Sequence, residues 1–162
     1  MRTLHNIDLK NNESGFTLRW QDRLILSHTA DAPCLWIGAG EADIEMFRGN
    51  FSIKDKLNEK IALTDATVTQ QSAGWAIRFT RGDAVSATLL VGVDAEGRLE
   101  LKLKNDAPGH NRIWLRLAAQ PDDHIYGCGE QFSYFDLRGK PFPLWTSEQG
   151  VGRNKQTYVT WQ

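Results

Sequence analysis

Apolar residues recur at every second position over several stretches of the chain between Phe16 and Leu117. The clearest of these stretches are residues 16–20, 75–79, 85–93, 99–103 and 113–117. Because successive side chains of a β-strand point to opposite faces, a period of two predicts strands with one buried face. Many short strands at this spacing predict an all-β fold of the sandwich type.

The last of these stretches combines apolar and cationic positions. Ile113, Leu115 and Leu117 alternate with the long side chains of residues 112, 114 and 116. We expect the three apolar residues to share a buried face, while the other face meets water or another element.

Residues 53–63 allow more than one structure. Ile53, Leu57 and Ile61 fall four positions apart, which fits a helix weakly. A single turn or a long hairpin arm fits the same residues equally well.

Residues typical of turns separate the alternating stretches, because they tolerate positive φ or form local hydrogen bonds. These turns are expected at Asn11-Asn12, Ser72–Gly74, Arg81–Asp83, Asp94–Gly97 and Asn105–Gly109. After Pro121 the alternation weakens, and the chain becomes rich in glycine, proline and aromatic residues. This composition predicts a long structured loop, with residues 124–156 as its loop-rich segment.

Overall charge and hydropathy exclude some partners. The chain has 19 basic and 20 acidic side chains, a net charge of −1, so no general field attracts nucleic acid. The N-terminus lacks a secretory signal, and no stretch approaches the roughly 20 apolar residues that cross a bilayer. We therefore expect a cytoplasmic location and no membrane partner.

The cysteines and histidines do not suggest a metal or cofactor. Cys34 and Cys128 are interpreted as buried reduced thiols. His124 and Cys128 could share a metal only on a helix, which the flanking glycines disfavour. The remaining histidines are expected to be solvated or locally hydrogen-bonded, namely His5, His28 and His110.

Carboxylates and aromatic rings share the segment after Pro121. Glu130, Asp136 and Glu148 lie among several rings there, a combination that sugar sites use for stacking and hydroxyl binding. Ion pairs such as Arg138 with Glu148 would explain the same residues by pinning the loop. From residue types alone, the structural explanation is favoured.

Three motifs in this segment are Tyr126–Glu130, Asp136–Lys140 and Leu144-Trp145. In their order and spacing, they resemble the amino-terminal domain of family 31 glycoside hydrolases. Within that family, residues 33–38, 46–52 and 111–162 are similar to the group of bacterial sulfoquinovosidases. The resemblance covers nearly the whole chain and is weakest before Phe16.

The resemblance implies a galactose-mutarotase-like β-sandwich over residues 1–162 that leads into a (β/α)8 barrel. It also implies a retaining mechanism with two aspartates, both of which belong to the barrel. No catalytic residue and no cofactor are therefore expected in this chain. The implied partners are the barrel and a carbohydrate substrate, a sulfoquinovosyl or glucosyl glycoside.

The resemblance further implies that the loop reaches from the sandwich toward the catalytic mouth of the barrel. The candidate substrate-binding residues on it are Glu130, Gln131, Arg138, Trp145, Glu148, Gln149 and Arg153.

The end of the sequence led to one more expectation. Residues 157–161 have the composition of a strand, so we expect a chain cut inside its domain and inactive alone. A free-standing carbohydrate-binding sandwich is the alternative. A mutarotase-like enzyme is a third possibility, which would need a pair such as His124 with Glu130.

Overall fold

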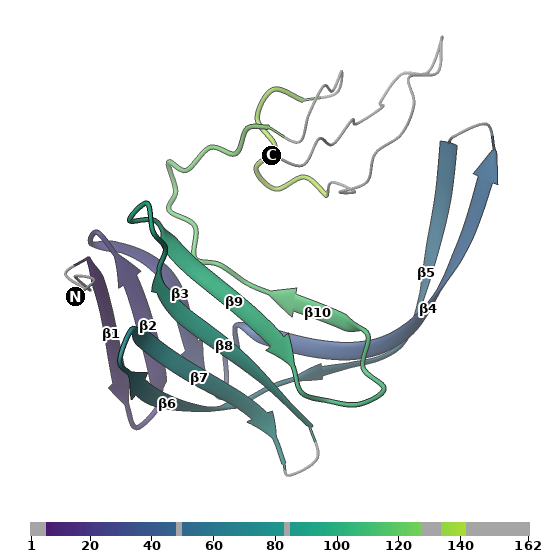
Figure 1. Ribbon diagram of the computed structural model, residues 1–162. Helices are drawn as coiled ribbons and strands as arrows, with labels where there is room; N and C mark the ends of the chain where they lie inside the picture. The colour runs from purple at the N-terminus through teal and green to yellow at the C-terminus, as the bar shows by residue number, and fades with distance from the viewer. Residues whose placement is uncertain (1–5, 48–49, 83–84, 128–133, 142–162) are drawn as a thin grey trace. The chain divides into compact units, whose positions relative to one another are not determined.

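A computed structural model describes residues 6–47, 50–82, 85–127 and 134–141 of the chain. Within these ranges the chain forms ten β-strands and no helix (Figure 1). The all-β prediction is therefore confirmed. None of the described residues belongs to a helix that could span a membrane.

The strands form three antiparallel sheets, which Figure 1 labels in chain order. The first sheet has the order β1 (Ile7–Asn12), β2 (Gly15–Trp20) and β3 (Arg23–Thr29). The second has the order β10 (Arg112–Leu115), β4 (Leu35–Phe47) and β5 (Asn50–Ala62). The third has the order β6 (Asp65–Gln71), β7 (Gly74–Arg81), β8 (Val85–Val93) and β9 (Leu99–Asn105).

The described residues divide into two compact units, which we treat separately. The first comprises the described residues within 6–41 and 56–119, and the second comprises those within 42–55 and 120–141. The main hydrophobic core lies in the first unit.

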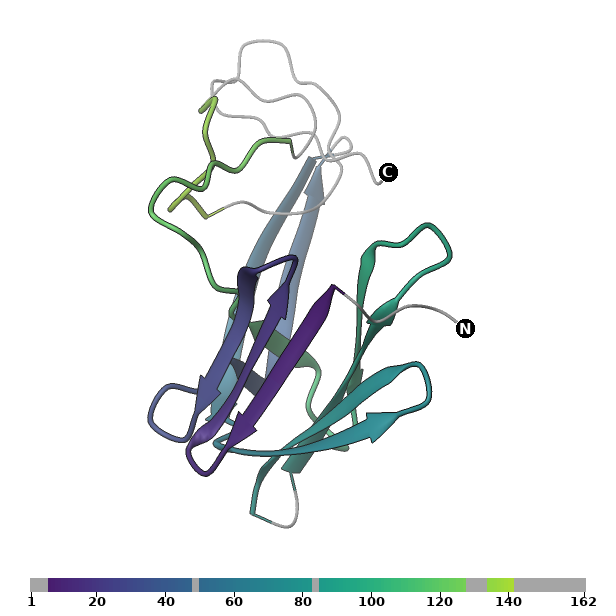
Figure 2. The same ribbon diagram turned by 90° about the vertical axis from the view of Figure 1, so that its left-hand side faces the viewer.

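All three sheets contribute side chains to this core. Its largest members include Phe16 of β2, Ile37 of β4 and Phe79 of β7, all at most 1% exposed. The rings of Phe16 and Phe79 meet edge to face with centroids 5.8 Å apart, which joins the first sheet to the third. Figure 2 shows β1–β3 and β6–β9 as two separate groups of strands. The sandwich prediction is confirmed.

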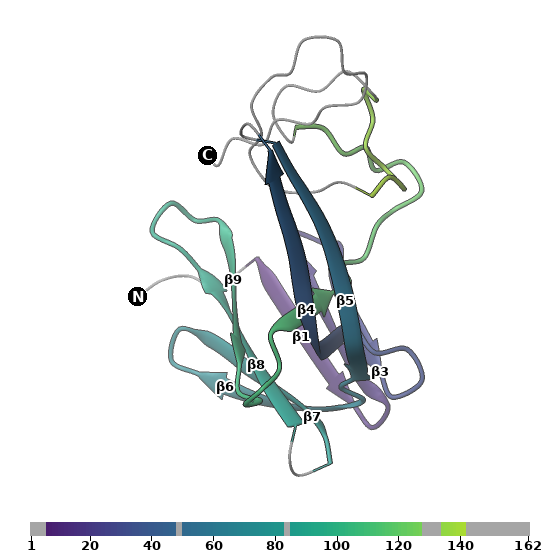
Figure 3. The same ribbon diagram turned by 90° about the vertical axis from the view of Figure 1, so that its right-hand side faces the viewer.

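The structure confirms one of the alternatives predicted for residues 53–63 and contradicts the prediction for residues 113–117. The hairpin-arm alternative is correct for the first, because residues 53–62 lie in β5, which runs beside β4 in a long hairpin (Figure 3). The shared buried face of the second is wrong: Ile113 is 38% and Leu117 is 54% exposed. β10 is an edge strand that ends at Leu115, so only Leu115 packs against the core.

The turn between β2 and β3 was not predicted from the sequence. Gln21 and Asp22 connect the strands with φ of 48° and 66°, as a two-residue type I′ turn requires. Arg19 supports the turn, since its Nη1 donates a hydrogen bond to the Asp22 carbonyl at 2.8 Å.

Cys34 is a buried free thiol, as expected, and burial raises its pKa to about 11. Its backbone N–H donates a hydrogen bond to Nδ1 of the buried His28 at 3.3 Å. The Nε2 atom of His28 lies 3.1 Å from the Thr64 carbonyl oxygen. Since Nδ1 accepts, the neutral ring carries its proton on Nε2 and donates to Thr64.

His110 is hydrogen-bonded locally through one ring nitrogen. Its Nδ1 lies 3.3 Å from the Pro108 carbonyl oxygen. Its buried Nε2 lies 3.2 Å from a carboxylate oxygen of Glu59 but makes no hydrogen bond among the described residues. The expectation of local hydrogen bonding is thus confirmed for His28 and His110. His5 and Cys128 lie outside the described residues.

Candidate functional site

Asp136 organises the described part of the segment after Pro121. Its Oδ2 lies 2.7 Å from Nδ1 of His124, and its Oδ1 accepts hydrogen bonds from the backbone N–H groups of Ile125 and Arg138 at 3.1 and 3.0 Å. The carboxylate therefore ties residues 124–125 to residues 136–138. A backbone hydrogen bond from Leu137 to the Ile125 carbonyl, at 2.8 Å, closes the same pair of stretches.

These contacts hold Asp136 in its charged form. The hydrogen bond with His124, followed by those from the Arg138 and Ile125 amides, lowers the pKa of Asp136 to about 2. A carboxyl group with so low a pKa is a poor proton donor near neutral pH. Asp136 is thus suited to orienting the loop rather than to acid catalysis.

Arg138 holds the loop from its other side. Its Nη1 donates to the carbonyl oxygens of Gln120, Pro121 and Asp123 at 2.6, 2.7 and 2.7 Å. The turn that it binds is closed by a hydrogen bond from the Gln120 N–H to the Asp123 carboxylate, at 2.7 Å. One guanidinium nitrogen therefore neutralises three converging carbonyl dipoles.

Aromatic rings lie on the surface of this pinned loop. Tyr126 stacks on His124 with centroids 6.0 Å apart and lies 5.1 Å from the ring of Phe135. Phe135 is 88% exposed and Tyr126 is 56% exposed. Rings held outward in this way can stack on the apolar face of a sugar or pack against another protein surface.

Arg138 is the one predicted substrate-binding residue that the described part of the chain contains. Glu130, Gln131, Trp145, Glu148, Gln149 and Arg153 lie outside the described residues. The structure accordingly brings Arg138 together with Asp136 and His124 and gives no geometry for the others. The Nη1 contacts of Arg138 hold the loop in place, which is the type of role that the structural alternative predicted. Their partners are backbone carbonyl oxygens.

The pairing of His124 with Asp136 was not found from the sequence, which suggested Glu130 as a partner for His124. Asp136 does carry one local signal. Its side chain accepts from the backbone N–H two residues later, which is the Asx-turn habit of aspartate before a turn. The 12-residue separation from His124 offers no comparable pattern.

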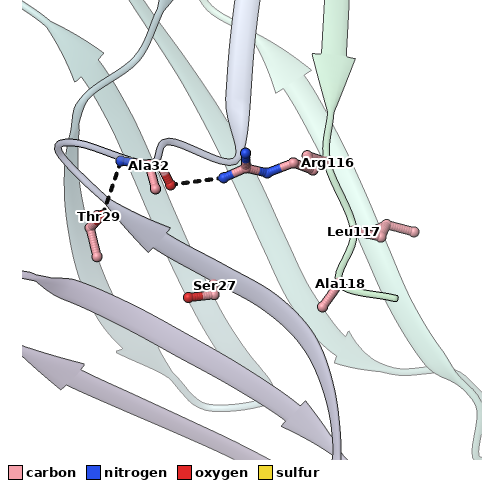
Figure 4. Close-up of a pocket in the computed structure, with 6 residues that line it drawn as sticks. All are labelled: Ser27, Thr29, Ala32, Arg116, Leu117 and Ala118. Carbon is pink, nitrogen blue, oxygen red and sulfur yellow. Dashed lines mark hydrogen bonds between the residues drawn. The ribbon is translucent and has the colours of Figure 1, made fainter. Parts of the chain in front are cut away.

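No group of histidine, cysteine or acidic side chains suited to a metal occurs among the described residues. Two small pockets lie in the first unit, and none of the candidate residues lines them. One has a volume of about 130 Å³ and is bordered by Ser27, Thr29, Ala32 and residues 116–118 (Figure 4). In it the Arg116 Nη2 donates to the Ala32 carbonyl at 3.0 Å.

The second pocket, of about 190 Å³, lies between residues 11–15 and residues 64–66. Ligand pockets for drug-sized molecules usually measure about 300–1,000 Å³. Both pockets are therefore too small to enclose a glycoside.

A second group of rings lies on the first unit. Lys60 Nζ is 4.6 Å from the ring centroid of Trp114 and 5.3 Å from that of Trp36, which Arg116 also covers at 5.5 Å. Trp114 packs so closely over Gly38 that a Cβ added there would lie 2.9 Å from its ring. These rings are occupied by protein groups, which indicates a structural role.

The sandwich and its pinned loop define a class of protein. Residues 8–161 match the glycosyl hydrolase 31 N-terminal galactose mutarotase-like domain. The chain therefore belongs to this family, as the resemblance implied.

Individual relatives narrow the comparison. The chain is 75% identical over 159 residues to a sulfoquinovosidase of Escherichia coli K12, covering 98% of this chain and 24% of that protein. It is 41% identical over 160 residues to a sulfoquinovosidase of Agrobacterium fabrum, covering 94% of this chain and 22% of that protein. A solved family 31 sulfoquinovosidase from E. rectale, in complex with an aza-sugar inhibitor, superimposes with a TM-score of 0.74 at 38% identity. This match covers 95% of this chain and 22% of the solved one. The chain thus spans less than a quarter of the length of these relatives.

Proposed function

We propose that this chain is the amino-terminal accessory portion of a retaining α-glycosidase that hydrolyses α-sulfoquinovosides. The observation that carries the proposal is the 75% identity with a sulfoquinovosidase across 98% of the chain. So high an identity over nearly the whole chain supports a common role in the complete enzyme. The enzyme would act in cytoplasmic carbohydrate catabolism.

The chemistry of the proposal resides outside this chain. In a retaining glycosidase one carboxylate forms the glycosyl-enzyme, and a second acts first as acid and then as base. We assign both groups to the catalytic barrel, so the 162-residue chain is inactive by itself. Its partners are that barrel and the glycoside.

The loop after Pro121 is the part of the chain that we assign to the pocket wall. The hydrogen bonds of Asp136 and Arg138 support this role, because a wall must hold its shape without the substrate. The exposed ring of Phe135 gives the loop a surface for stacking or domain contact. Glu130, Gln131, Trp145, Glu148, Gln149 and Arg153 complete the proposed set with Arg138.

A direct test joins this chain to the remainder of the 75% identical relative, in place of the matched part. We expect the graft to hydrolyse a chromogenic α-sulfoquinovoside faster than the matching α-glucoside, and the chain alone to hydrolyse neither. Turnover by the chain alone, or a graft that accepts only the glucoside, would contradict the proposal.

The exposed rings of Tyr126 and Phe135 also favour a second candidate, a carbohydrate-binding module that acts without catalysis. Calorimetric titration of the chain alone with sulfoquinovose and with glucose distinguishes the two. Saturable binding by the isolated chain supports the module, whereas the accessory role predicts binding only in the graft.

A further inference from the structure

The arm formed by the outer parts of β4 and β5 exposes apolar side chains in the second unit. Ile44, Met46 and Ile53 are 57%, 62% and 36% exposed. We call these three residues the arm patch. Isolated exposed apolar residues are normal, but a contiguous group on one strand pair marks an interaction surface.

The sequence of the arm has the alternating pattern of a strand pair with one buried face. Along β4, the acidic residues Glu41, Asp43 and Glu45 alternate with residues 42, 44 and 46, which are alanine, isoleucine and methionine. Such alternation is typical of a sheet with one face in water and the other face packed. Yet residues 41–47 are all exposed, on both faces.

The two strands present the patch on the same side. A Cβ added to Gly38 would lie 2.3 Å from the Glu59 carbonyl, and one added to Gly40 would lie 3.4 Å from the Leu57 Cα. Both contacts fit one antiparallel register, in which each step forward along β4 pairs with one step backward along β5. Continued outward by four residues, this register places Ile44 opposite Ile53, so their side chains share a face.

We propose that the arm patch packs against the polypeptide that follows this region in the full-length relatives, while the opposite, charged face of the arm remains in water. This proposal rests on the proposed function. Relatives of this chain are about four times longer, since it covers 22–24% of their length. The arm belongs to the same compact unit as the last described residues, 120–127 and 134–141, so the patch lies on the unit that contains the later part of the described chain.

Met46 provides a probe, because the chain contains one other methionine, Met1. Oxidation of a methionine by dilute hydrogen peroxide depends on the exposure of its sulfur. We expect Met46 to be oxidised more slowly in the graft than in the chain alone. Peptide mass spectrometry measures both rates.

Matched variants test the energetics. Met46→Gln should lower the melting temperature of the graft and leave that of the chain alone unchanged, because Met46 is 62% exposed there. Glu45→Gln, on the opposite face, should change neither. Equal melting temperatures for the two graft variants would overturn the proposal.

The remaining outcomes separate this proposal from the proposed function. An active graft in which Met46 is oxidised as fast as in the chain alone overturns the arm proposal and keeps the function. A graft that unfolds cooperatively and protects Met46 but hydrolyses no sulfoquinovoside keeps the arm proposal and overturns the proposed function. Protection in the chain alone that rises with protein concentration would assign the patch to a second copy and overturn the proposal. A second graft, onto the 41% identical relative, serves if the first fails to fold.

Discussion

The Nη1 atom of Arg138 donates a hydrogen bond to the carbonyl oxygen of Gln120, 2.6 Å away and 18 residues earlier in the chain. The same atom also binds the carbonyl oxygens of Pro121 and Asp123. Carbonyl oxygens that converge on one point repel each other unless a cation lies between them. Arg138 therefore sets the conformation of the chain where the sandwich ends and the loop begins.

Replacing Arg138 with methionine keeps the aliphatic stem and removes every donor. We expect the stretch 120–124 to open more easily by about 1–3 kcal/mol, the usual cost of losing hydrogen bonds to a charged group. Hydrogen exchange of the amides in residues 120–127 measures this opening. Lys140→Met is the matched control, since Lys140 lies over the Tyr134 ring instead, 4.6 Å from its centroid. Equal exchange in the two variants would contradict the role of Arg138.

Asp136 makes the same loop sensitive to acid. Its folded pKa, about 2, lies below the ordinary value of 3.8, so its contribution to stability is present above pH 3.8. That contribution is lost as the pH falls through 2, because protonation removes the acceptor of three hydrogen bonds. Limited pepsin digestion between pH 4 and pH 2 should therefore cleave residues 120–141 progressively faster, when each rate is divided by that of an unfolded peptide at the same pH to remove the pH dependence of pepsin.

Asp136→Asn provides the comparison for this acid effect. The variant should already be cleaved quickly at pH 4 and should change little as the pH falls further. Asp122→Asn, in the same segment, should behave as the parent chain does. A parent and an Asp136→Asn variant with the same pH profile would show that another group controls the loop.

The sequence predicted the strands that alternate regularly and missed features that depend on contacts between strands. Strand β3 contains three consecutive apolar residues, 24–26, which hide the period of two. Pairing of β2 with β3 also shifts register between Leu18 and Arg19, so the alternation is interrupted at a bulge. Glutamine at position 21 is not a typical residue for positive φ, which explains why the turn was missed.

The site was less accessible to sequence reasoning than the fold. Aromatic and charged residues identified the loop, but residue types cannot tell which carboxylate pairs with which base. His124 pairs with Asp136, 12 residues away, through a loop path that no period describes. The role of Arg138 also depends on backbone carbonyls, which every residue carries and no composition reveals.

His28 should make the sandwich less stable in mild acid. Burial lowers its pKa, against a smaller opposing effect of the Thr64 carbonyl, so the folded chain holds the ring neutral. The unfolded chain then takes up the proton first as the pH falls below about 6.5, and the free energy of unfolding decreases. Urea midpoints at pH 7.5 and 5.5 should show this decrease.

The variant His28→Gln isolates this effect. It should be less stable than the parent at pH 7.5, because it leaves a gap between Phe16 and Phe79, which both pack on the His28 ring. Its stability should nevertheless change less between the two pH values. A decrease that persists unchanged in His28→Gln would assign the acid effect to another group.

Gly74 allows a close approach between β7 and the neighbouring strand β8. With φ of 148° it occupies a region that other residues avoid, and an added Cβ would lie 1.9 Å from the Val91 carbonyl oxygen. Neither atom is at the end of a flexible side chain, so the two strands must separate. We expect Gly74→Ala to destabilise the chain by about 3 kcal/mol or more in chemical denaturation.

Gly97→Ala is the control for this prediction. Gly97 has φ of 82° but nothing within 4 Å of its added Cβ, so only the backbone cost of about 1–2 kcal/mol applies. Equal losses in the two variants would mean that backbone conformation alone, and not the contact with Val91, requires glycine at position 74.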